Sequence, residues 1–252
     1  MLNEERRQKI QQILSVKKRL LVGEVSQEFG TSQVTIRKDL EILEKRGILT
    51  RVHGGAIFNS SASQDLALTE KERLHTSEKR RIAYLAESFI SPGDTIILDS
   101  GSTTTQLAHL LKYKKGITVI TNAVNVASEL AASELTVILT GGMLREKSFS
   151  LVGPIAEDSL QSITADKLFL GVDGIDFEFG LTTPNILEAR VNKMMIKAAA
   201  QVIVLADSSK FGRRSVGVID SLDTIDRIVT DSNISKEYLQ GLSELGIEIS
   251  TV

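Results

Sequence analysis

Hydroxyl side chains cluster in one short segment, Asp99-Ser-Gly-Ser-Thr-Thr-Thr105, which follows an apolar run. Gly101 allows a tight turn there, so hydroxyl and backbone N–H groups can converge on one anion at the start of a helix. An ordinary capped turn needs one such hydroxyl and accounts poorly for four in the five residues 100–104. The segment therefore predicts a phosphate-binding loop. Its candidate ligands are Asp99, Ser100, Gly101, Ser102, Thr103 and Thr104.

Polar and glycine residues also follow several other apolar runs of the chain. In a parallel sheet the carboxyl ends of the strands share one edge, so loops after strands line a common crevice. Any one of these loops is equally well explained as a turn, but four loops in the same position favour a binding site. Their charged groups would bind a polyhydroxylated ligand and balance its charge. The candidates are Thr121, Asn122, Gly141, Gly142, Arg145, Asp173, Asp176, Glu188 and Lys210.

Near the amino terminus, the segment Ser32-Gln-Val-Thr-Ile-Arg-Lys-Asp-Leu40 is typical of a helix with one polar face. Helical spacing predicts that Val34, Leu40 and Leu43 point into a small bundle, with Ile36 at their border. The opposite face then carries amide, hydroxyl and guanidinium groups. In the second position of a helix-turn-helix, such a helix enters the DNA major groove.

Individual side chains of this helix suggest different kinds of DNA contact. Arg37 would read a guanine edge or grip a phosphate, and Gln33 would pair with adenine. The candidate DNA contacts are Thr31, Ser32, Gln33, Thr35, Arg37, Lys38, Arg51 and His53. The alternative is an ordinary charged surface helix. It is disfavoured because Arg6, a glycine turn, this helix and a hairpin occur in the order that a DNA-binding domain requires.

The elements around this helix predict a winged helix-turn-helix over residues 1–57. Helices are expected over residues 4–16, 22–29 and 32–46, with Gly30 as a left-handed cap and Thr31 or Ser32 opening the third helix. Residues 48–57 alternate like strands and are expected to turn at Gly54-Gly55, which predicts the wing.

The rest of the chain predicts a linker over residues 58–76 and a sensor domain over residues 77–252. A charged helix is expected from Glu70 to about Ile90, with Ser77 as a possible cap. Strands are expected at 95–98, 117–121, 135–139, 167–171, 201–206, 226–230 and 246–250, with helices near 104–112, 123–132, 153–162, 185–200 and 235–243. This alternation predicts an α/β domain with a mainly parallel sheet.

Composition restricts the possible functions further. The 252 residues are 42% hydrophobic and include no cysteine, which excludes disulfides and thiolate metal sites. The three histidines have no metal-ligand spacing and no catalytic partner, so neither a metal nor a cofactor is expected. No apolar run has the roughly 18 residues of a membrane span, so a cytoplasmic protein without membrane association is expected.

Charge is distributed unevenly along the chain. Residues 1–57 contain 11 Lys/Arg and 7 Asp/Glu, giving +4, whereas residues 58–252 contain 19 and 25, giving −6. A basic head on an acidic body predicts a polyanionic partner for the head.

These motifs, in this order, resemble the DeoR family of bacterial sugar-metabolism repressors along essentially the whole chain. The resemblance rests on Arg6, Ile10 and Leu14, on residues 32–40 and on the loop at 99–105. Further matches are Thr-Asn (121–122), Thr-Gly-Gly (140–142), Leu-Gly-Val-Asp-Gly-Ile-Asp (170–176), Glu-Ala-Arg (188–190) and Asp-Ser-Ser-Lys-Phe (207–211). The resemblance implies a repressor of a sugar or amino-sugar operon, whose sensor domain binds a sugar phosphate and is similar in fold to ribose-5-phosphate isomerase. Within the family, residues 181–185 and 188–192 look most like those of regulators of amino-sugar or galactosamine-type pathways.

The similarity to the isomerase raises the alternative of an enzyme with a DNA-binding head. Asp173, Asp176, Glu188 and Lys210 resemble the isomerase's paired aspartates, carboxylate base and substrate lysine. The isomerase's lysine- and glycine-rich segment after the aspartates has no counterpart in residues 177–187, so no enzyme activity is expected.

An activator, or a regulator that responds to a protein partner instead of a metabolite, is the third possibility. Operator DNA is the expected partner of a homo-oligomer, either a dimer or a tetramer, because one recognition helix reads too few base pairs.

Overall fold

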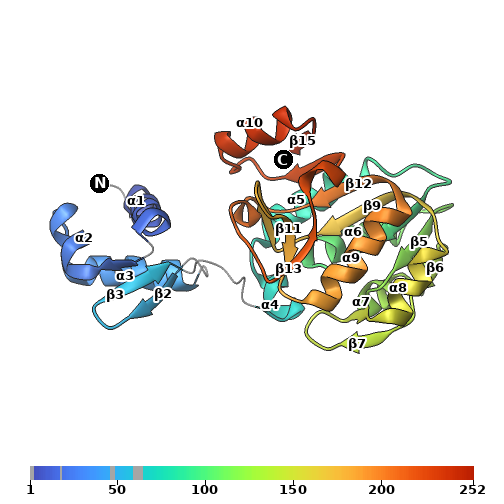
Figure 1. The fold of residues 1–252 in the computed structure, drawn as a ribbon, viewed down its shortest axis with the longest axis horizontal. Helices are drawn as coiled ribbons and strands as arrows, with labels where there is room; N and C mark the ends of the chain where they lie inside the picture. The colour runs from blue at the N-terminus through green and yellow to red at the C-terminus, as the bar shows by residue number, and fades with distance from the viewer. Residues whose placement is uncertain (1–2, 18, 46–48, 59–64) are drawn as a thin grey trace. The chain divides into compact units, whose positions relative to one another are not determined.

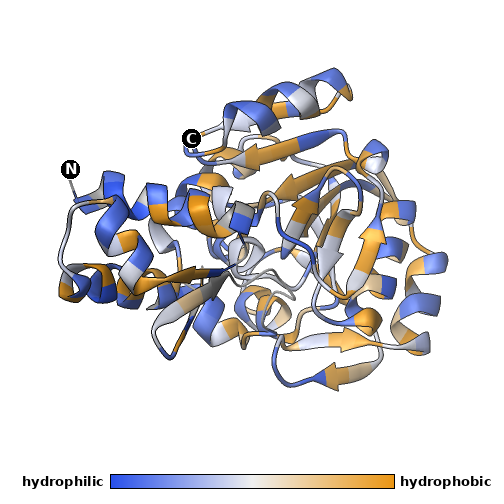
Figure 2. Cartoon of the chain, turned by 60° about the vertical axis from the view of Figure 1, so that its left-hand side comes forward, coloured by the Kyte–Doolittle hydropathy of each residue, from blue (hydrophilic) through white to orange (hydrophobic). Residues whose placement is uncertain are grey.

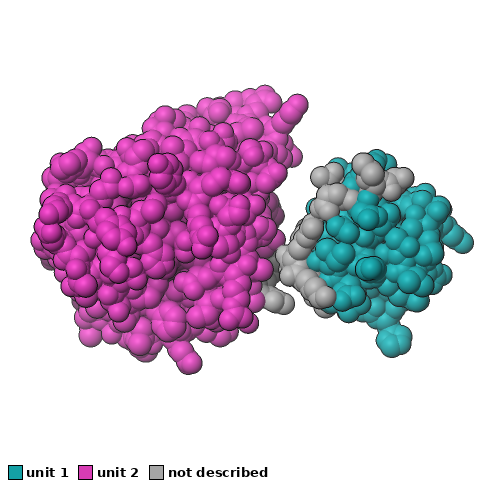
Figure 3. Space-filling view, turned by 180° about the vertical axis from the view of Figure 1, so that it is seen from behind, with its two compact units in different colours: residues 1–62 teal, residues 63–252 magenta. Residues whose placement is uncertain are grey.

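The computed structural model describes residues 3–17, 19–45, 49–58 and 65–252. Internal contacts divide the chain into two compact units, Met1–Ala62 and Ser63–Val252, coloured separately in Figure 3. Below, the first unit is called the head and the second unit the body.

The head contains three helices and a small antiparallel sheet (Figure 1). Its helices are α1 (Asn3–Lys17), α2 (Val22–Glu28) and α3 (Gln33–Lys45), and its strands are β1 (Arg19–Leu21), β2 (Leu49–Val52) and β3 (Gly55–Phe58), in the order β1-β3-β2. Buried apolar residues of all three helices form one core, to which α1 contributes Ile10 and Leu14. The predicted winged helix-turn-helix is confirmed, with β1 as a third strand that was not predicted.

Two local predictions for the head were wrong. Val34 is 72% exposed, whereas Ile36, Leu40 and Leu43 are buried. The last three follow i, i+4, i+7 spacing, and Val34 lies about 200° around the helix from Ile36. The hairpin turns one residue earlier than predicted, because Gly55 already pairs within the sheet. A side chain at Gly55 would lie 2.1 Å from the Leu20 carbonyl oxygen, so only glycine fits there.

The body is built on a seven-stranded sheet in which every neighbouring pair is parallel. Its strands, in spatial order, are β15 (Glu248–Thr251), β14 (Arg227–Thr230), β12 (Ala199–Leu205), β9 (Ala165–Gly171), β4 (Thr95–Leu98), β5 (Thr118–Thr121) and β6 (Thr136–Leu139). The predicted α/β class and all seven predicted strands are confirmed.

Helices cover both faces of this sheet, so successive residues of the central strands enter different cores. One face packs against α5 (Thr76–Glu87), α6 (Ser102–Leu111) and α7 (Val124–Leu130). The other packs against α8 (Pro154–Gln161), α9 (Ile186–Ala198) and α10 (Lys236–Glu244). In Figure 2 the sheet strands are mainly hydrophobic and the helices carry both kinds of residue. This two-sided burial explains why the strands read as continuous apolar runs.

Smaller elements surround the sheet. They are a hairpin of β7 (Met143–Arg145) and β8 (Ser150–Val152), a three-stranded sheet of β10 (Gly174–Asp176), β11 (Gly180–Thr183) and β13 (Gly217–Asp220), and 3-10 turns at Ser208–Lys210 and Leu222–Thr224. None of these strands was predicted. No helix within the described ranges is long and apolar enough to cross a membrane.

The charged stretch before the sheet forms two helices where one was predicted. The first is α4 (Leu68–Arg73), and the second is α5, which begins at Thr76. His75 between them has a left-handed backbone, with φ of 51°, which ends the first helix and redirects the chain. Ser77 therefore lies inside α5 and does not cap it. Residues 65–76 fall within the predicted linker, yet they belong to the body by their contacts.

Candidate functional site

A cleft of the body lies at the point where the strand order reverses. From β4 the chain continues outward to β5 and β6, and from β9 it continues the other way to β12, β14 and β15. Asp99 follows β4, and Asp173 follows β9. In open α/β sheets, ligands bind in the crevice outside the strand ends at such a switch point. The hollow has an empty volume of about 590 Å³, counting the part that is open to solvent.

Hydroxyl groups of the loop at 99–105 divide into two classes. Thr104 Oγ1 donates to the Asp99 and Gly101 carbonyl oxygens at 2.7 and 2.9 Å, and Thr105 Oγ1 donates to Gly101 O at 2.8 Å. Ser102 and Thr103 line the cleft, and their hydroxyls have no hydrogen-bond partner among the described residues. They lie in the first turn of α6, whose positive end favours an anion. Two of the predicted hydroxyls are therefore free for a ligand, and Thr104 stabilises the loop.

Asp173 forms the charged wall of the cleft together with two lysines. Lys71 Nζ lies 2.7 Å from Asp173 Oδ1, and Lys210 Nζ lies 3.7 Å from the same oxygen. Thr183 Oγ1 donates to Asp173 Oδ2 at 3.3 Å. Burial alone would raise the pKa of Asp173, but the two ammonium groups hold it below its ordinary value. Asp173 is therefore an ionised partner shared by two cations.

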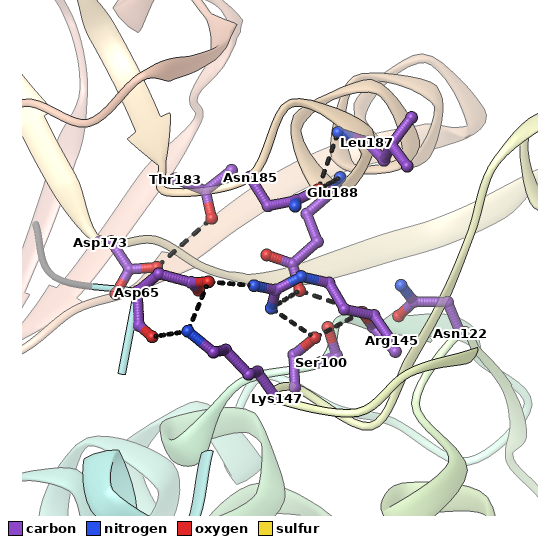
Figure 4. Close-up of polar contacts among 12 residues, drawn as sticks. Asp65, Ser100, Asn122, Arg145, Lys147, Asp173, Thr183, Asn185, Leu187 and Glu188 are labelled. Atoms are coloured by element: carbon purple, nitrogen blue, oxygen red, sulfur yellow. Dashed lines mark hydrogen bonds and ion pairs between the residues drawn. The ribbon is translucent and has the colours of Figure 1, made fainter. Parts of the chain in front are cut away.

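Glu188 forms the opposite wall, at the start of α9. Asn185 caps this helix by accepting from the Leu187 and Glu188 amides (Figure 4). Glu188 Oε1 accepts from Arg145 Nη1 at 3.2 Å and from Ser150 Oγ at 3.0 Å. Arg145 does not itself line the cleft, and it positions the Glu188 carboxylate from behind.

Asp99 lies at the bottom of the cleft and is 2% exposed. Its Oδ2 accepts from Gly171 N at 3.2 Å, and the Asn192 amide, with its nitrogen turned inward, donates to Oδ1 at 3.2 Å. Burial, followed by repulsion from Glu188, raises the pKa of Asp99 to about 7. The carboxyl is therefore partly protonated near neutral pH, which reduces the negative charge at the bottom of the cleft.

Several predicted site residues lie outside the cleft, on or after β5 and β6, which are one and two strands beyond β4 in the sheet. Thr121 Oγ1 donates to Leu98 O, and Asn122 Nδ2 donates to Leu151 O. A Cβ at Gly141 or Gly142 would lie 2.7 Å from Ile155 Cγ2 or 2.8 Å from Val152 O, respectively. These positions support packing at the sheet edge.

Asp176 also lies apart from the cleft, at the end of β10, where the chain turns into β11. Its Oδ1 accepts from the Glu178 and Phe179 amides, and its Oδ2 pairs with Arg214 Nε at 2.9 Å. Burial would raise the pKa of Asp176, but the Arg214 hydrogen bond lowers it below the ordinary value. This carboxylate therefore holds the turn.

The cleft also contains residues that the sequence did not predict. They are Leu66, Leu68, Lys71, Lys147, Ser148, Gly171, Val172, Thr183, Asn192 and Leu205, and with the predicted Asp99, Ser100, Gly101, Ser102, Thr103, Asp173, Glu188 and Lys210 they complete the lining. The sequence could have indicated Asn192 as a cleft residue, because it lies one helical turn after the predicted Glu188 and therefore on the same face of the helix. Lys71 and Lys147 belong to segments without a motif. Among the described residues, no cluster of His, Asp and Glu could hold a metal ion.

The candidate DNA-binding surface of the head centres on α3. Ser32 Oγ accepts from Thr35 N at 3.2 Å and caps the helix. Arg37 and Lys38 are exposed, and Arg37 Nη2 donates to Gln33 Oε1 at 3.3 Å. The same turn exposes Val34, whose isopropyl group is suited to contact with a thymine methyl.

The remaining predicted DNA contacts flank α3. Thr31 is half-buried, and its Oγ1 donates to Phe29 O at 3.2 Å. Arg51 and His53 are exposed in the hairpin, where Arg51 Nε lies 2.6 Å from Glu44 Oε2. A phosphate contact by Arg51 would therefore require exchange of this ion pair.

A buried ion pair holds α3 against α1. Arg6 Nε lies 2.5 Å from Asp39 Oδ2, and Arg7 Nε lies 3.0 Å from Asp39 Oδ1. Asp39 belongs to the polar motif of residues 32–40, yet it is 2% exposed. It therefore orients the helix and is not available to DNA.

Comparison with known proteins gives matches over both units. Residues 6–62 match the DeoR-like helix-turn-helix domain, and residues 74–232 match the DeoR C-terminal sensor domain. A protein of Escherichia coli O157:H7 named for transcriptional repression of the aga operon is 42% identical over 98% of this chain and 93% of its own length. The transcriptional regulator GlpR of Haloferax volcanii is 37% identical over 99% and 98%, and the lactose phosphotransferase system repressor of Lactococcus lactis is 35% identical over 96% and 97%.

Solved structures give looser matches. A ribose-5-phosphate isomerase in complex with phospho-erythronic acid aligns with a TM-score of 0.42 and 20% identity over 54% of each chain. The full-length sorbitol operon regulator SorC of Klebsiella pneumoniae aligns with a TM-score of 0.38 and 13% identity over 81% of this chain and 88% of its own. At these values the matches carry no information on function.

Proposed function

Because this chain belongs to the DeoR family of helix-turn-helix transcriptional regulators, we propose that it represses an operon for the use of a sugar or amino sugar. In this proposal the head binds operator DNA, and a phosphorylated sugar bound in the body controls that binding. The names of two relatives support the choice of repressor, since they refer to repression of the aga operon and of a lactose phosphotransferase system.

The cleft at the switch point is the observation on which the effector proposal depends. It combines two free hydroxyls at a helix start with three lining lysines, which are Lys71, Lys147 and Lys210. A phosphate would be bound by the hydroxyls, the helix amides and a lysine. The carboxylates of Asp173 and Glu188 would then accept hydrogen bonds from sugar hydroxyl groups.

On the DNA side, we propose that exposed residues of α3 read the major groove and that the protein acts as a homo-oligomer. Gln33, Val34 and Arg37 supply an amide, an apolar group and a guanidinium within one helical turn and a half. A single helix of this kind contacts only a few base pairs, so two or more heads are needed to specify an operator.

A ligand screen followed by a DNA titration tests the proposal. Hexose and hexosamine 6-phosphates, pentose phosphates and the unphosphorylated sugars are compared by thermal shift on the full-length protein, because a ligand that binds only the native state raises its melting temperature. The best ligand is then titrated into the complex with DNA selected from random oligonucleotides. A sugar phosphate should stabilise the protein and change its DNA affinity. A flat response to every phosphate would refute the proposal.

Two variants separate the functions of the units. Thr103→Asp places a negative charge where the phosphate is expected and should abolish ligand binding while DNA binding persists. Arg37→Ala should weaken specific DNA binding and leave ligand binding unchanged. Loss of both activities in either variant would indicate misfolding, and would not support the assigned roles.

The enzyme alternative retains one favourable observation, which is that Glu188 and the partly protonated Asp99 line the same cleft. Against it, Glu188 Oε1 is already engaged by Arg145 and Ser150. An isomerase assay with pentose and hexose phosphates decides between the two functions. Turnover by the wild type that is lost in Glu188→Gln would establish the enzyme, and we expect no turnover.

A further inference from the structure

A segment of the body, residues 65–73, lies beside the cleft and is called the strap below. It contains α4, and the buried Leu68 side chain lines the cleft. Leu68 N donates to Lys147 O at 2.6 Å. At the start of the strap, Asp65 lies 2.5 Å from Arg145 Nη2 and 3.2 Å from Lys147 Nζ (Figure 4). The strap is therefore bonded to the hairpin of β7 and β8, whose Arg145 and Ser150 donate hydrogen bonds to Glu188.

The other end of the strap is fixed by a buried lysine. Lys79, in α5, is 3% exposed, and its ammonium group donates to the carbonyl oxygens of Lys71 and Leu74. Burial lowers the pKa of Lys79 to about 8. These contacts hold the backbone of Lys71 next to the cleft.

The side chain of Lys71 points at the cleft wall and not into solvent. Its Nζ lies 2.7 and 2.9 Å from the two oxygens of Asp173, and only 22% of the side chain is exposed. Lys210 approaches the same carboxylate at 3.7 Å. Lys210 also interacts with the Asp207 carboxylate and lowers its pKa, so each of the two lysines has a carboxylate partner, and Lys71 presents its ammonium group in the same cleft as the free hydroxyls of Ser102 and Thr103.

We infer that Lys71 is an effector-binding residue and that the strap is part of the effector site. The Lys71 ammonium group binds the anionic group of the ligand together with Ser102 and Thr103, while Lys210 continues to pair with Asp173. This inference rests on the proposed function. It adds to the effector site a binding residue that does not lie in a loop after a strand of the large sheet. It also gives the effector a direct contact with the segment that leads toward the head, since residues 59–64 alone separate the strap from β3 in sequence.

The test compares Lys71→Met with Lys167→Met in the full-length protein. Lys167 is a matched control, because it is 19% exposed, forms an ion pair with Asp94 and does not line the cleft. Inorganic phosphate and the best sugar phosphate of the screen are titrated by calorimetry, and melting temperatures confirm folding. Lys71→Met should weaken binding of both anions by about tenfold or more, as expected for a lost charge-assisted hydrogen bond, and Lys167→Met should not.

Hydrogen exchange of the strap provides the second readout. The amides of Glu70, Lys71 and Leu74 are hydrogen-bonded within α4 and its end, so their exchange reports strap opening. The sugar phosphate should slow their exchange in the wild type and in Lys167→Met, but not in Lys71→Met. Unchanged affinity in a folded Lys71→Met variant would overturn the inference alone. Absence of anion binding by the wild type would overturn the proposed function as well.

Discussion

Replacement by valine should change a different property of the protein at each of two neighbouring threonines. Thr103→Val should weaken ligand binding, and Thr104→Val should lower the stability of the body. Thr103 has a hydroxyl that faces the cleft without a partner, whereas the Thr104 hydroxyl bonds to Asp99 O and Gly101 O within the loop. Replacement by valine preserves the shape of each side chain and removes only the hydroxyl. The pair therefore distinguishes a ligand-binding group from a group that holds the loop.

The expected magnitudes follow from these contacts. In Thr103→Val, loss of one charge-assisted bond to phosphate costs about 1.5–3 kcal/mol, which weakens sugar-phosphate binding roughly 10- to 150-fold. The unliganded protein should keep its stability. In Thr104→Val, the Asp99 carbonyl oxygen loses its donor, which costs about 1–3 kcal/mol of unfolding free energy, while Gly101 O still accepts from Thr105. The body should then melt roughly 2–4 °C lower for each kcal/mol lost.

Calorimetric titration with the best ligand of the screen and thermal melts without ligand measure the two effects. The account requires that Thr103→Val changes affinity and not melting temperature, and that Thr104→Val lowers the melting temperature. Wild-type affinity in Thr103→Val would show that the free hydroxyl does not contact the ligand. Equal destabilisation by the two variants would refute the division of the loop into two classes.

Three further predictions concern other parts of the molecule. Arg37→Ala should weaken operator binding by about 1–3 kcal/mol in a fluorescence anisotropy titration, and wild-type affinity would exclude Arg37 as a base contact. Asp39→Asn leaves the buried Arg6 charge without its partner, which costs about 3–5 kcal/mol and should unfold the head, while a calorimetric scan still shows the transition of the body. For Asp99, the folded-state pKa of about 7 exceeds the ordinary 3.8, so its contribution to stability is lost as pH rises through 7. Melting temperatures from pH 5 to 8 should therefore fall less in Asp99→Asn than in the wild type, and parallel curves would contradict the raised pKa.

Local patterns in the sequence were sufficient to predict most of the fold. Apolar runs such as 95–98 and 201–206 predicted the strands, since both faces of the sheet are covered and most residues of these two runs are buried. The small strands β10, β11 and β13 were missed because they are short and interrupted by glycine and polar residues. The split between α4 and α5 was missed because the left-handed backbone of His75 has no signal in composition.

The candidate site was predicted only in part, because strand order is a property of the whole sheet. All loops after strands look equivalent in sequence, yet of the loops after the strands of the large sheet only those after β4, β9 and β12 contribute described residues to the cleft. Thr121 ends β5 and donates to Leu98 O, and Gly141 follows β6 and packs against Ile155, so neither lines the cleft. Lys71 contacts Asp173 across 102 residues of sequence, and no local pattern indicates such a pair.

Helical spacing gave the correct class of DNA-binding domain but assigned one face incorrectly. Ile36, Leu40 and Leu43 form a complete apolar stripe without Val34. Val34 is therefore not needed to complete the apolar face that packs into the core of the head. Its exposure places an apolar group on a surface that had been predicted as polar.

We propose that the cleft of the body and the candidate DNA-binding surface of the head are thermodynamically coupled. Linkage requires that the effector and the operator change each other's affinity by the same factor. The most direct measurement is calorimetric titration of the effector into the full-length protein, first alone and then saturated with operator DNA. The account predicts that operator weakens effector binding by the factor with which effector weakens operator binding. Equal effector affinity in the two titrations would contradict it.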